Sequence, residues 1–275
     1  MSLHPVCPVC GAVLTMGEHS WACENRHSFD VARQGYVNLL TVDRKHSLHP
    51  GDTRDMVLAR RELLDTGVYR PIADALCRLL GEYCPEAESI LDAGCGEGYY
   101  LSRVEAAFPR AELWGVDISK DAVRYAAGRS KKARFLAGTA AALPFADGGA
   151  DAVLSMFALT VGEEYARVLR DGGIFIQVLA GSEHLMGLKS IIYPEILRRE
   201  KHQQEELPDF ALLHHETLEF AFSLEDGRQV GNLLSMTPHF WRISREGAER
   251  LANTSRLDDR AQVVFNVYRA EKRGG

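Results

Sequence analysis

The chain has 275 residues, of which 46% are hydrophobic, and a formal net charge of −6. This length allows one sizeable core with a small accessory unit, or two modest domains. No run of about 18 apolar residues occurs and no secretory signal opens the chain, so we expect a cytoplasmic protein with no membrane segment. The acidic balance argues against a uniformly basic, nucleic-acid-coating surface. It leaves RNA binding open, because binding depends on where the charges lie.

A metal-binding pattern occupies the first residues of the chain. Cys7 and Cys10 form a C-x2-C pair, and Cys23 and His27 follow as C-x3-H after a gap of 12 residues. A short hairpin that joins the two pairs would place four ligands in the tetrahedron that zinc prefers, and a closed four-ligand site is structural. The other three of the six cysteines stand singly, which is not a disulfide framework.

The residues between the two pairs favour such a hairpin. Gly11 follows the first pair, and Gly17-Glu18 offers a turn between short strands ending near Leu14 and starting near Trp21. We therefore expect a zinc module over residues 1–35, which has too little core to fold without its metal. The alternative is a redox-active thiol pair, although the helix that would follow such a pair is absent from the pattern.

Basic and aromatic residues alternate in and just after this module. Such a mixture would suit the phosphates and unstacked bases of an RNA loop, and equally the aromatic rings would pack the small core. The residues concerned are Arg26, Arg33, Arg44, Lys45, Trp21, Phe29 and Tyr36.

Residues 36–85 read as a connecting segment that is mainly helical and packs on the next domain. After an exposed polar loop, Asp52 or Thr53 can cap a helix that runs from Met56 to Asp65. Pro71 then opens a second helix, which ends at Leu80.

A glycine-rich turn opens the third region, residues 86–275. A short apolar strand ends at Asp92, glycines follow at positions 94, 96 and 98, and a helix is expected from Tyr99 to Phe108. This is the first strand–helix unit of a doubly wound sheet, whose ligands bind at the carboxyl ends of the strands. The spacing G-x-G-x-G differs from the G-x-G-x-x-G of nicotinamide enzymes, which remain the alternative.

The second strand, Glu112–Asp117, ends in an acid 25 residues after Asp92. In such folds this acid accepts hydrogen bonds from ribose hydroxyls. Backbone approach at Gly94, Gly96 and Gly98 would fit the amino-acid part of S-adenosylmethionine, and Asp92 is placed for its ammonium or for a bridging water. We add Ile118, next to Asp117, and Thr139, which would lie beside the adenine.

The remaining elements alternate as a Rossmann-like α/β sheet requires. Near the C-terminus, two alternating segments would form the antiparallel pair that closes the sheet. The expected elements are helices at 120–129 and 163–169, strands at 133–137, 152–155 and 174–179, and closing strands at 216–222 and 262–270.

The order of these motifs resembles the RlmA family, also called RrmA, of large-subunit ribosomal RNA guanine-N1 methyltransferases. The resemblance covers nearly the whole chain. It is carried by the four zinc ligands and by His27–Asp30 (HSFD), Gly35–Leu40 (GYVNLL), Asp65–Tyr69 (DTGVY), Asp92–Tyr99 (DAGCGEGY) and His184–Met186 (HLM).

The resemblance implies a class I methyltransferase that methylates N1 of a guanine in a hairpin loop of 23S ribosomal RNA. The zinc module would help to recognise the hairpin, and Tyr69, Glu97 and His184 would join the S-adenosylmethionine site. From the residues alone, His184 is a surface histidine at a helix start. Relatives modify one of two neighbouring guanines, and the sequence does not indicate which. A homodimer would let two zinc modules hold one RNA.

The chain departs from the family pattern after the fourth strand, where Ala158-Leu159-Thr160 replaces an Ala-Pro pair. No catalytic base is assigned. Two alternatives remain: a small-molecule methyltransferase that acts on a quinone or metabolite, and a cofactor-binding RNA-binding or resistance factor with little catalysis. A basic segment, 120–134, is either a solvated helix face or part of the substrate site.

Overall fold

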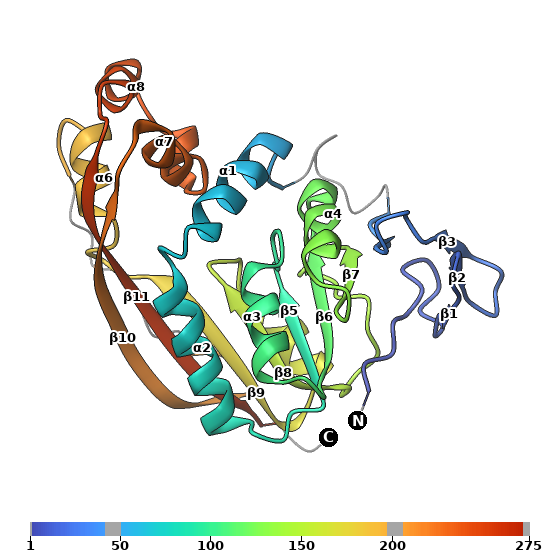
Figure 1. The fold of residues 1–275 in the computed structure, drawn as a ribbon. Coiled ribbons are helices and arrows are strands. Elements are labelled where there is room, and N and C mark those ends of the chain that lie inside the picture. The colour runs from blue at the N-terminus through green and yellow to red at the C-terminus, as the bar shows by residue number, and fades with distance from the viewer. Residues whose placement is uncertain (1, 42–50, 197–205, 272–275) are drawn as a thin grey trace.

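An eight-stranded sheet forms the centre of the computed structural model, which describes residues 2–41, 51–196 and 206–271 (Figure 1). The strand order is β10-β11-β9-β8-β5-β6-β7-β4. The strands are β4 (Val37–Asn38), β5 (Ser89–Ala93), β6 (Glu112–Asp117), β7 (Arg134–Ala137), β8 (Ala150–Met156), β9 (Leu169–Ala180), β10 (Phe210–Leu224) and β11 (Leu257–Ala270).

Strands β4 to β9 pair in parallel, and β11 and β10 extend the sheet antiparallel beyond β9. The predicted Rossmann-like sheet and its closing antiparallel pair are therefore confirmed. Strand β9 begins earlier than the expected residue 174, because its pairing with β8 runs from Leu169 across an irregular register to Ile174. Gly172, with φ of 70°, lies within that irregularity.

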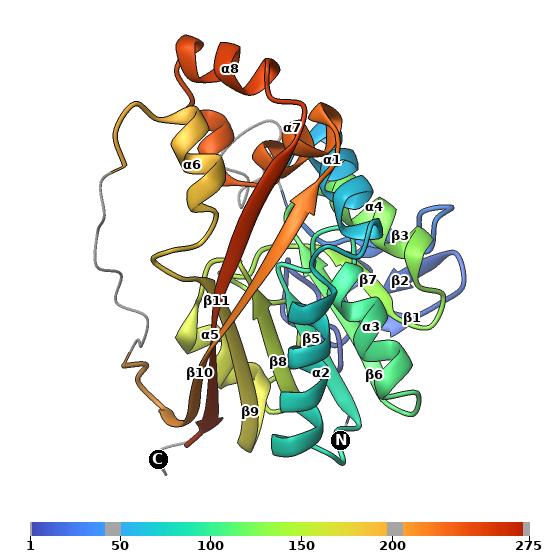
Figure 2. The same ribbon diagram turned by 60° about the vertical axis from the view of Figure 1, so that its left-hand side comes forward.

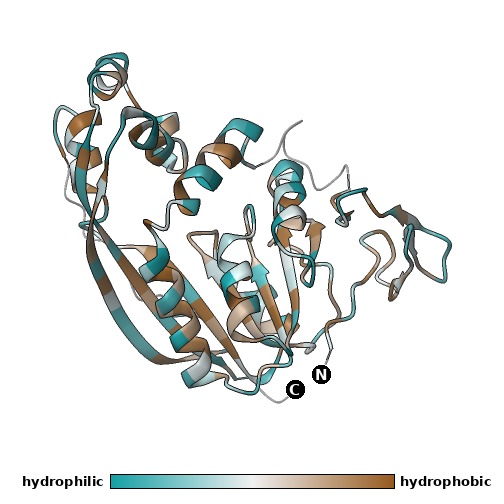
Figure 3. Cartoon of the chain, viewed as in Figure 1, coloured by the Kyte–Doolittle hydropathy of each residue, from teal (hydrophilic) through white to brown (hydrophobic). Residues whose placement is uncertain are grey.

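Alternate residues of the strands enter two separate cores, one on each face of the sheet. Ile90 packs on the face covered by α2 (Arg70–Tyr83), α3 (Tyr99–Ala107) and α4 (Lys120–Arg129). Its neighbour Leu91 packs on the other face, against α5 (Gly162–Val168) and the N-terminal module. Figure 3 shows the hydrophobic residues concentrated on the central strands and on the helix sides that face them.

A helical cap lies beyond the carboxyl ends of the parallel strands (Figures 1 and 2). It consists of α1 (Arg54–Asp65), α6 (Met186–Ile192), α7 (Gly227–Ser235), the 3-10 helix η2 (Pro238–Trp241) and α8 (Arg245–Ala252). The sequence predicted α1, and Thr53 is its N-cap, accepting a hydrogen bond from the Met56 amide. Of the other cap helices, the sequence indicated only a start near His184, where α6 begins two residues later. These helices are too short for a periodic pattern to stand out.

The N-terminal module holds a three-stranded sheet of β1 (Thr15–Met16), β2 (Ser20–Ala22) and β3 (Ser28–Asp30). It packs on the large sheet through Trp21, whose ring meets that of Trp114 edge-on at 6.0 Å. The amide of Val6 also donates to the carbonyl of Pro144 at 2.9 Å. Trp21 is buried, as its packing role predicted.

The connecting segment contributes a strand as well as helices. Residues 37–38 form β4, which pairs in parallel with β7 at the edge of the large sheet. Two residues give too short an alternation to reveal a strand in the sequence. Arg44 and Lys45, with most of the predicted polar loop, lie outside the described residues. In the described parts of the chain, no helix has both the length and the apolar character needed to cross a bilayer.

Candidate metal centre and cofactor pocket

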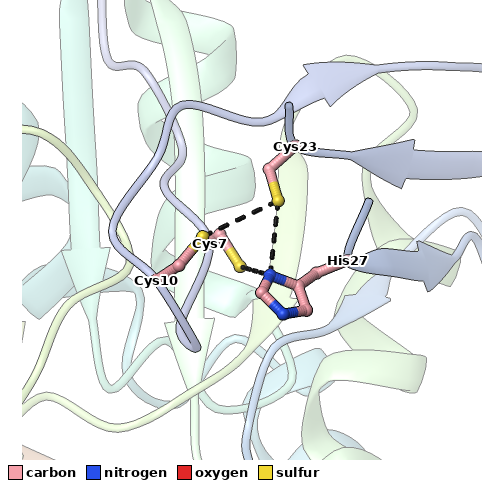
Figure 4. Close-up of side chains that lie close together, drawn as sticks. All are labelled: Cys7, Cys10, Cys23 and His27. Atoms are coloured by element: carbon pink, nitrogen blue, oxygen red, sulfur yellow. Dashed lines mark hydrogen bonds between the residues drawn. The ribbon is translucent and has the colours of Figure 1, made fainter. Parts of the chain in front are cut away.

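The four predicted zinc ligands converge on one point (Figure 4). The Nδ1 atom of His27 lies 3.5 Å from Sγ of Cys7 and 3.4 Å from Sγ of Cys23. The Sγ atoms of Cys10 and Cys23 are 3.7 Å apart. All four ligand atoms lie within 4.8 Å of one another. These are the distances at which four side chains share a single ion.

Two tight turns bring the ligands together. In the first, the amide of Gly11 donates to the carbonyl of Cys7 at 2.8 Å, and Gly11 adopts a positive φ of 75°. In the second, Arg26 has φ of 65°, and the amide of Cys23 donates to the carbonyl of His27. Each turn therefore aims its pair of ligands inward, as the two-residue and three-residue spacings predicted.

The donor set fits zinc. Zn–S bonds of about 2.3 Å and Zn–N bonds of about 2.0 Å make a tetrahedron with edges of roughly 3.5–3.8 Å, close to the three separations of 3.4, 3.5 and 3.7 Å. The Asn25 amide donates to Cys10 Sγ at 3.4 Å, and this contact is the largest of several that lower the pKa of the thiol to about 6. Zinc binds thiolates, so a thiol that is readily deprotonated favours the metal. Four protein ligands leave no open position, and the zinc is structural.

A cavity of about 730 Å³ lies between the carboxyl ends of the parallel strands and the helical cap. Its volume is that of a small-molecule or cofactor site. Of the ten predicted cofactor residues, eight line it, whereas Asp92 and Gly98 lie behind its wall. The eight are Tyr69, Gly94, Gly96, Glu97, Asp117, Ile118, Thr139 and His184.

The glycine-rich turn has a backbone that only glycine adopts readily. Gly94, Gly96 and Gly98 have φ of 92°, 54° and 82°. A Cβ atom at Gly94 would lie 2.5 Å from Cβ of Ala158, on the loop after β8. A Cβ at Gly98 would lie 3.0 Å from Cβ of Ala126 in α4, so Gly98 serves the packing of helices while Gly94 and Gly96 face the cavity.

Asp117 is held firmly at the end of β6. Its two carboxylate oxygens accept hydrogen bonds from the amides of Gly96 at 2.9 Å and Ser119 at 2.8 Å. Burial raises the pKa of Asp117, and these two amides oppose that shift. Each carboxylate oxygen has a second lone pair, so Asp117 keeps acceptor capacity for hydroxyl groups of a ligand.

Asp92 is fully buried, and neither of its carboxylate oxygens has a hydrogen-bond partner among the described residues. Burial raises the pKa of Asp92 to about 8, with further contributions from the nearby carboxylates of Asp117 and Glu97. A buried carboxylate without a partner is costly. The ammonium of an amino-acid ligand, or a water that it binds, would supply the missing partner.

Replacing Asp92 by Asn is expected to flatten the pH dependence of stability in the cofactor-free protein. The folded-state pKa of about 8 exceeds the ordinary value of 3.8, so the folded chain retains a proton that the unfolded chain loses. The free energy of unfolding therefore falls as pH rises between these two values, and Asn removes this fall. Urea unfolding at pH 5 and pH 8.5 measures the difference.

The same variant is expected to bind S-adenosylmethionine about 10-fold to 100-fold more weakly, the range for losing a charge-assisted hydrogen bond. Titration calorimetry gives the affinity. Asp74→Asn, an exposed carboxylate on α2 outside the cavity, is the matched control. An unchanged affinity in Asp92→Asn would remove this residue from the cofactor site.

Tyr69 and His184 meet in the cavity wall, 115 residues apart in the chain. The Tyr69 hydroxyl lies 3.5 Å from Nε2 of His184, and Nδ1 of His184 lies 2.9 Å from the carbonyl of Gln262 in β11. The amide of Gln262 lies 3.3 Å from the same Nδ1, so this nitrogen is held by Gln262 whether it donates to the carbonyl or accepts from the amide. His184 is buried, with 9% of its surface exposed, so the expectation of a surface histidine was wrong.

Several cavity residues were not predicted. Arg60 of α1 forms an ion pair with Asp52 at 2.5 Å and lies 3.6 Å from where a Cβ of Gly96 would be. Phe157 and Leu159, after β8, and His239 and Arg242 of the cap also line the cavity. No motif of fixed spacing contains these residues, because they come from elements that meet only in the folded chain. The departure at Leu159 was the one available signal.

The comparisons with known proteins agree with this arrangement. A model described as RlmA, N-terminal matches residues 6–48, and a methyltransferase-domain model matches residues 90–173. The 23S rRNA (guanine(748)-N(1))-methyltransferase of Streptomyces fradiae is 36% identical over 96% of this chain and 95% of its own. A putative 23S rRNA (guanine-N(1)-)-methyltransferase of Bacillus subtilis, YxjB, is 29% identical over 92% of each chain.

Among solved structures, a complex of the Haloferax volcanii Trm112 methyltransferase activator with a putative methyltransferase matches with a TM-score of 0.50. The identity is 19%, and the match covers 80% of this chain and 100% of that chain, which supports the fold alone. The RlmA N-terminal match spans the four residues of the metal centre, and the similarity to the Streptomyces enzyme covers nearly the full length of both chains. The chain belongs to the RlmA family of 23S ribosomal RNA (guanine-N1)-methyltransferases.

Proposed function

We propose that the protein methylates N1 of one guanine in a hairpin loop of 23S ribosomal RNA, and that it acts in the cytoplasm, where its substrate is. The observation that carries this proposal is the 36% identity to the Streptomyces enzyme over 96% of the chain, together with the RlmA N-terminal match over residues 6–48, which contain the zinc ligands. Within the proposal, residues 1–35 recognise RNA, 36–85 connect, and 86–275 catalyse. A homodimer that grips one RNA with two zinc modules stays a prediction.

S-adenosylmethionine supplies the methyl group, and the residues of the chain must orient both partners. Transfer to a nitrogen needs in-line geometry, so positioning gives most of the rate enhancement. Guanine N1 carries a proton that has to leave as the new N–C bond forms. The described residues assign no side chain to accept that proton, since the His184 ring, an imidazole of the cavity wall, already contacts Tyr69 and Gln262. Water is therefore the proposed acceptor.

Exposed cations of the basic segment and of the zinc module support an RNA substrate. Lys120 and Arg124 of α4 and Lys132 after it are exposed, and Lys120 lies two residues beyond Ile118 of the cavity wall. In contrast, Arg134 of the same segment pairs with Glu112 at 2.7 Å. In the zinc module, Arg26 and Arg33 are also exposed. The basic segment therefore has exposed cations that can bind RNA phosphates, in addition to Arg134, which forms an ion pair within the protein.

Primer extension tests the proposal directly. Ribosomal RNA from a strain that lacks the family's methyltransferase is incubated with the purified, zinc-loaded protein and S-adenosylmethionine. A methyl group on N1 blocks the pairing edge of guanine, so we expect a new stop of reverse transcriptase one nucleotide before the target. Guanine 748, which the name of the Streptomyces relative specifies, is the first position to inspect. The absence of any new stop would refute the assignment.

Two rivals give different results in the same assay. A small-molecule methyltransferase would bind S-adenosylmethionine but transfer no label to RNA, and its activity would be indifferent to the zinc module. An RNA-binding or resistance factor would bind both the cofactor and the hairpin without forming a product. Binding and label transfer, measured side by side, therefore separate all three functions.

A further inference from the structure

The loop that follows β8, residues 157–160, is held rigidly at the cavity wall. The amide of Phe157 donates to the carbonyl of Val178 at 2.9 Å, and the Tyr165 hydroxyl donates to the carbonyl of Leu159 at 2.8 Å. The side-chain amide of Gln177, which is fully buried, donates to the hydroxyl of Thr160 at 2.7 Å. Buried groups thus fix this loop, which we call the pocket loop, along its whole length.

The rigid pocket loop presents two large apolar side chains outward. Phe157 is 38% exposed and Leu159 is 74% exposed, and both line the cavity. Phe157 also has φ of 56°, a left-handed conformation that is strained for a bulky side chain. A glycine at position 157 would adopt this φ without strain, and a polar residue there would avoid exposing apolar surface to water. Strain of this kind that the surroundings enforce is concentrated at functional sites.

The ring of Phe157 lies among other aromatic rings of the cavity wall. Its ring lies 6.2 Å from the ring of His184 at an interplanar angle of 32°, and 6.4 Å from that of Tyr100. The next residue, Ala158, touches the glycine-rich turn at Gly94. The phenyl ring therefore stands beside the place where the cofactor's amino-acid part is expected.

We propose that Phe157 stacks on the target guanine and that Leu159 packs against the same nucleotide where it enters the cavity. This inference rests on the proposed function. A guanine drawn out of its loop loses the stacking of its neighbours, and an aromatic side chain replaces part of that loss. The free energy cost of the strained backbone and of the exposed ring is already met in the folded protein. The ring of Phe157 therefore needs no rearrangement when the base binds.

The test compares four variants on an RNA hairpin that contains the target guanine. Phe157→Gly relieves the strained φ while removing the ring, and Phe157→Leu keeps apolar bulk without a flat face. Each is expected to lower kcat/KM for RNA about 10-fold to 100-fold, the effect of losing one base–aromatic stack. The loss should lie mainly in KM. Phe157→Tyr should restore activity close to the wild-type value, and Leu213→Ala, a similarly exposed residue of β10 outside the cavity, should leave it unchanged.

Cofactor affinity and zinc content are measured on every variant. Unchanged values, together with low activity in the Gly and Leu variants and recovery in the Tyr variant, support the stacking role. Wild-type activity in either the Gly or the Leu variant would overturn it. If the wild-type protein itself methylates no RNA, the proposed function fails instead, so the two failures are distinguishable.

Discussion

Replacing Cys7 by Ser is expected to abolish zinc binding and to reduce methylation of ribosomal RNA more than about 100-fold. Cys7 is buried, with 1% of its surface exposed, and shares the metal with Cys10, Cys23 and His27. Binding of a structural zinc supplies about 10–16 kcal/mol, which is as large as the whole stability of a typical domain. Without it, the module has too small a core to keep the surface that we propose faces RNA in place.

Binding of S-adenosylmethionine should survive this change at low temperature, because none of the described residues 2–41 lines the cavity. Zinc content by mass spectrometry, cofactor affinity by calorimetry and primer extension on ribosomal RNA make the three measurements. Cys77→Ser, a half-buried thiol of α2 outside the cluster, is the control. Full methylation by a zinc-free Cys7 variant would show that the module is dispensable.

Replacing Gly94 by Ala is expected to weaken S-adenosylmethionine binding about 100-fold or more. The new Cβ would meet Cβ of Ala158 at 2.5 Å, and φ of 92° is unfavourable for alanine. Overpacking of this kind costs about 1–3 kcal/mol, and the left-handed backbone about 1–2 kcal/mol more. The glycine-rich turn must therefore shift, and it is this turn that faces the cavity.

A second substitution separates the two causes. Ala158→Gly removes the atom that the new side chain meets, so the double variant Gly94→Ala with Ala158→Gly should recover the overpacking part and retain the backbone part. Calorimetric titration of the four proteins gives the coupling energy. Gly81→Ala, in α2 with open space around it, should bind the cofactor normally. Additive effects in the double variant would mean that Ala158 does not limit the turn.

Local patterns predicted the parts of the fold that local interactions determine. The strand from residue 89, the three glycines and the helix from Tyr99 are consecutive, so their order alone indicated a strand–turn–helix unit. The zinc ligands were equally readable, because two turns of fixed length place them. Fold class, the structural zinc as a cofactor and the family were all confirmed.

Long-range contacts determine what the sequence did not reveal. His184 is buried where it contacts Gln262, which is 78 residues away in the chain. Likewise, the lack of a hydrogen-bond partner for the Asp92 carboxylate among the described residues is a property of the folded state that no local pattern shows. The cap helices other than α1 are short and owe their stability to packing rather than to propensity. The individual cofactor residues stay predictions, although eight of them line one cavity.

The zinc module takes the place of a helix layer on one face of the catalytic sheet. Its side chains share a hydrophobic core with Leu91, Trp114 and Phe145, and Trp114 is fully buried beneath Trp21. Losing the module would uncover this core, so the metal is thermodynamically linked to the domain that holds the cofactor. Each tenfold rise in free zinc above its dissociation constant then adds about 1.4 kcal/mol to the stability of the folded chain. The half-life of the folded enzyme should consequently increase with the concentration of free zinc, a metal that does not take part in methyl transfer.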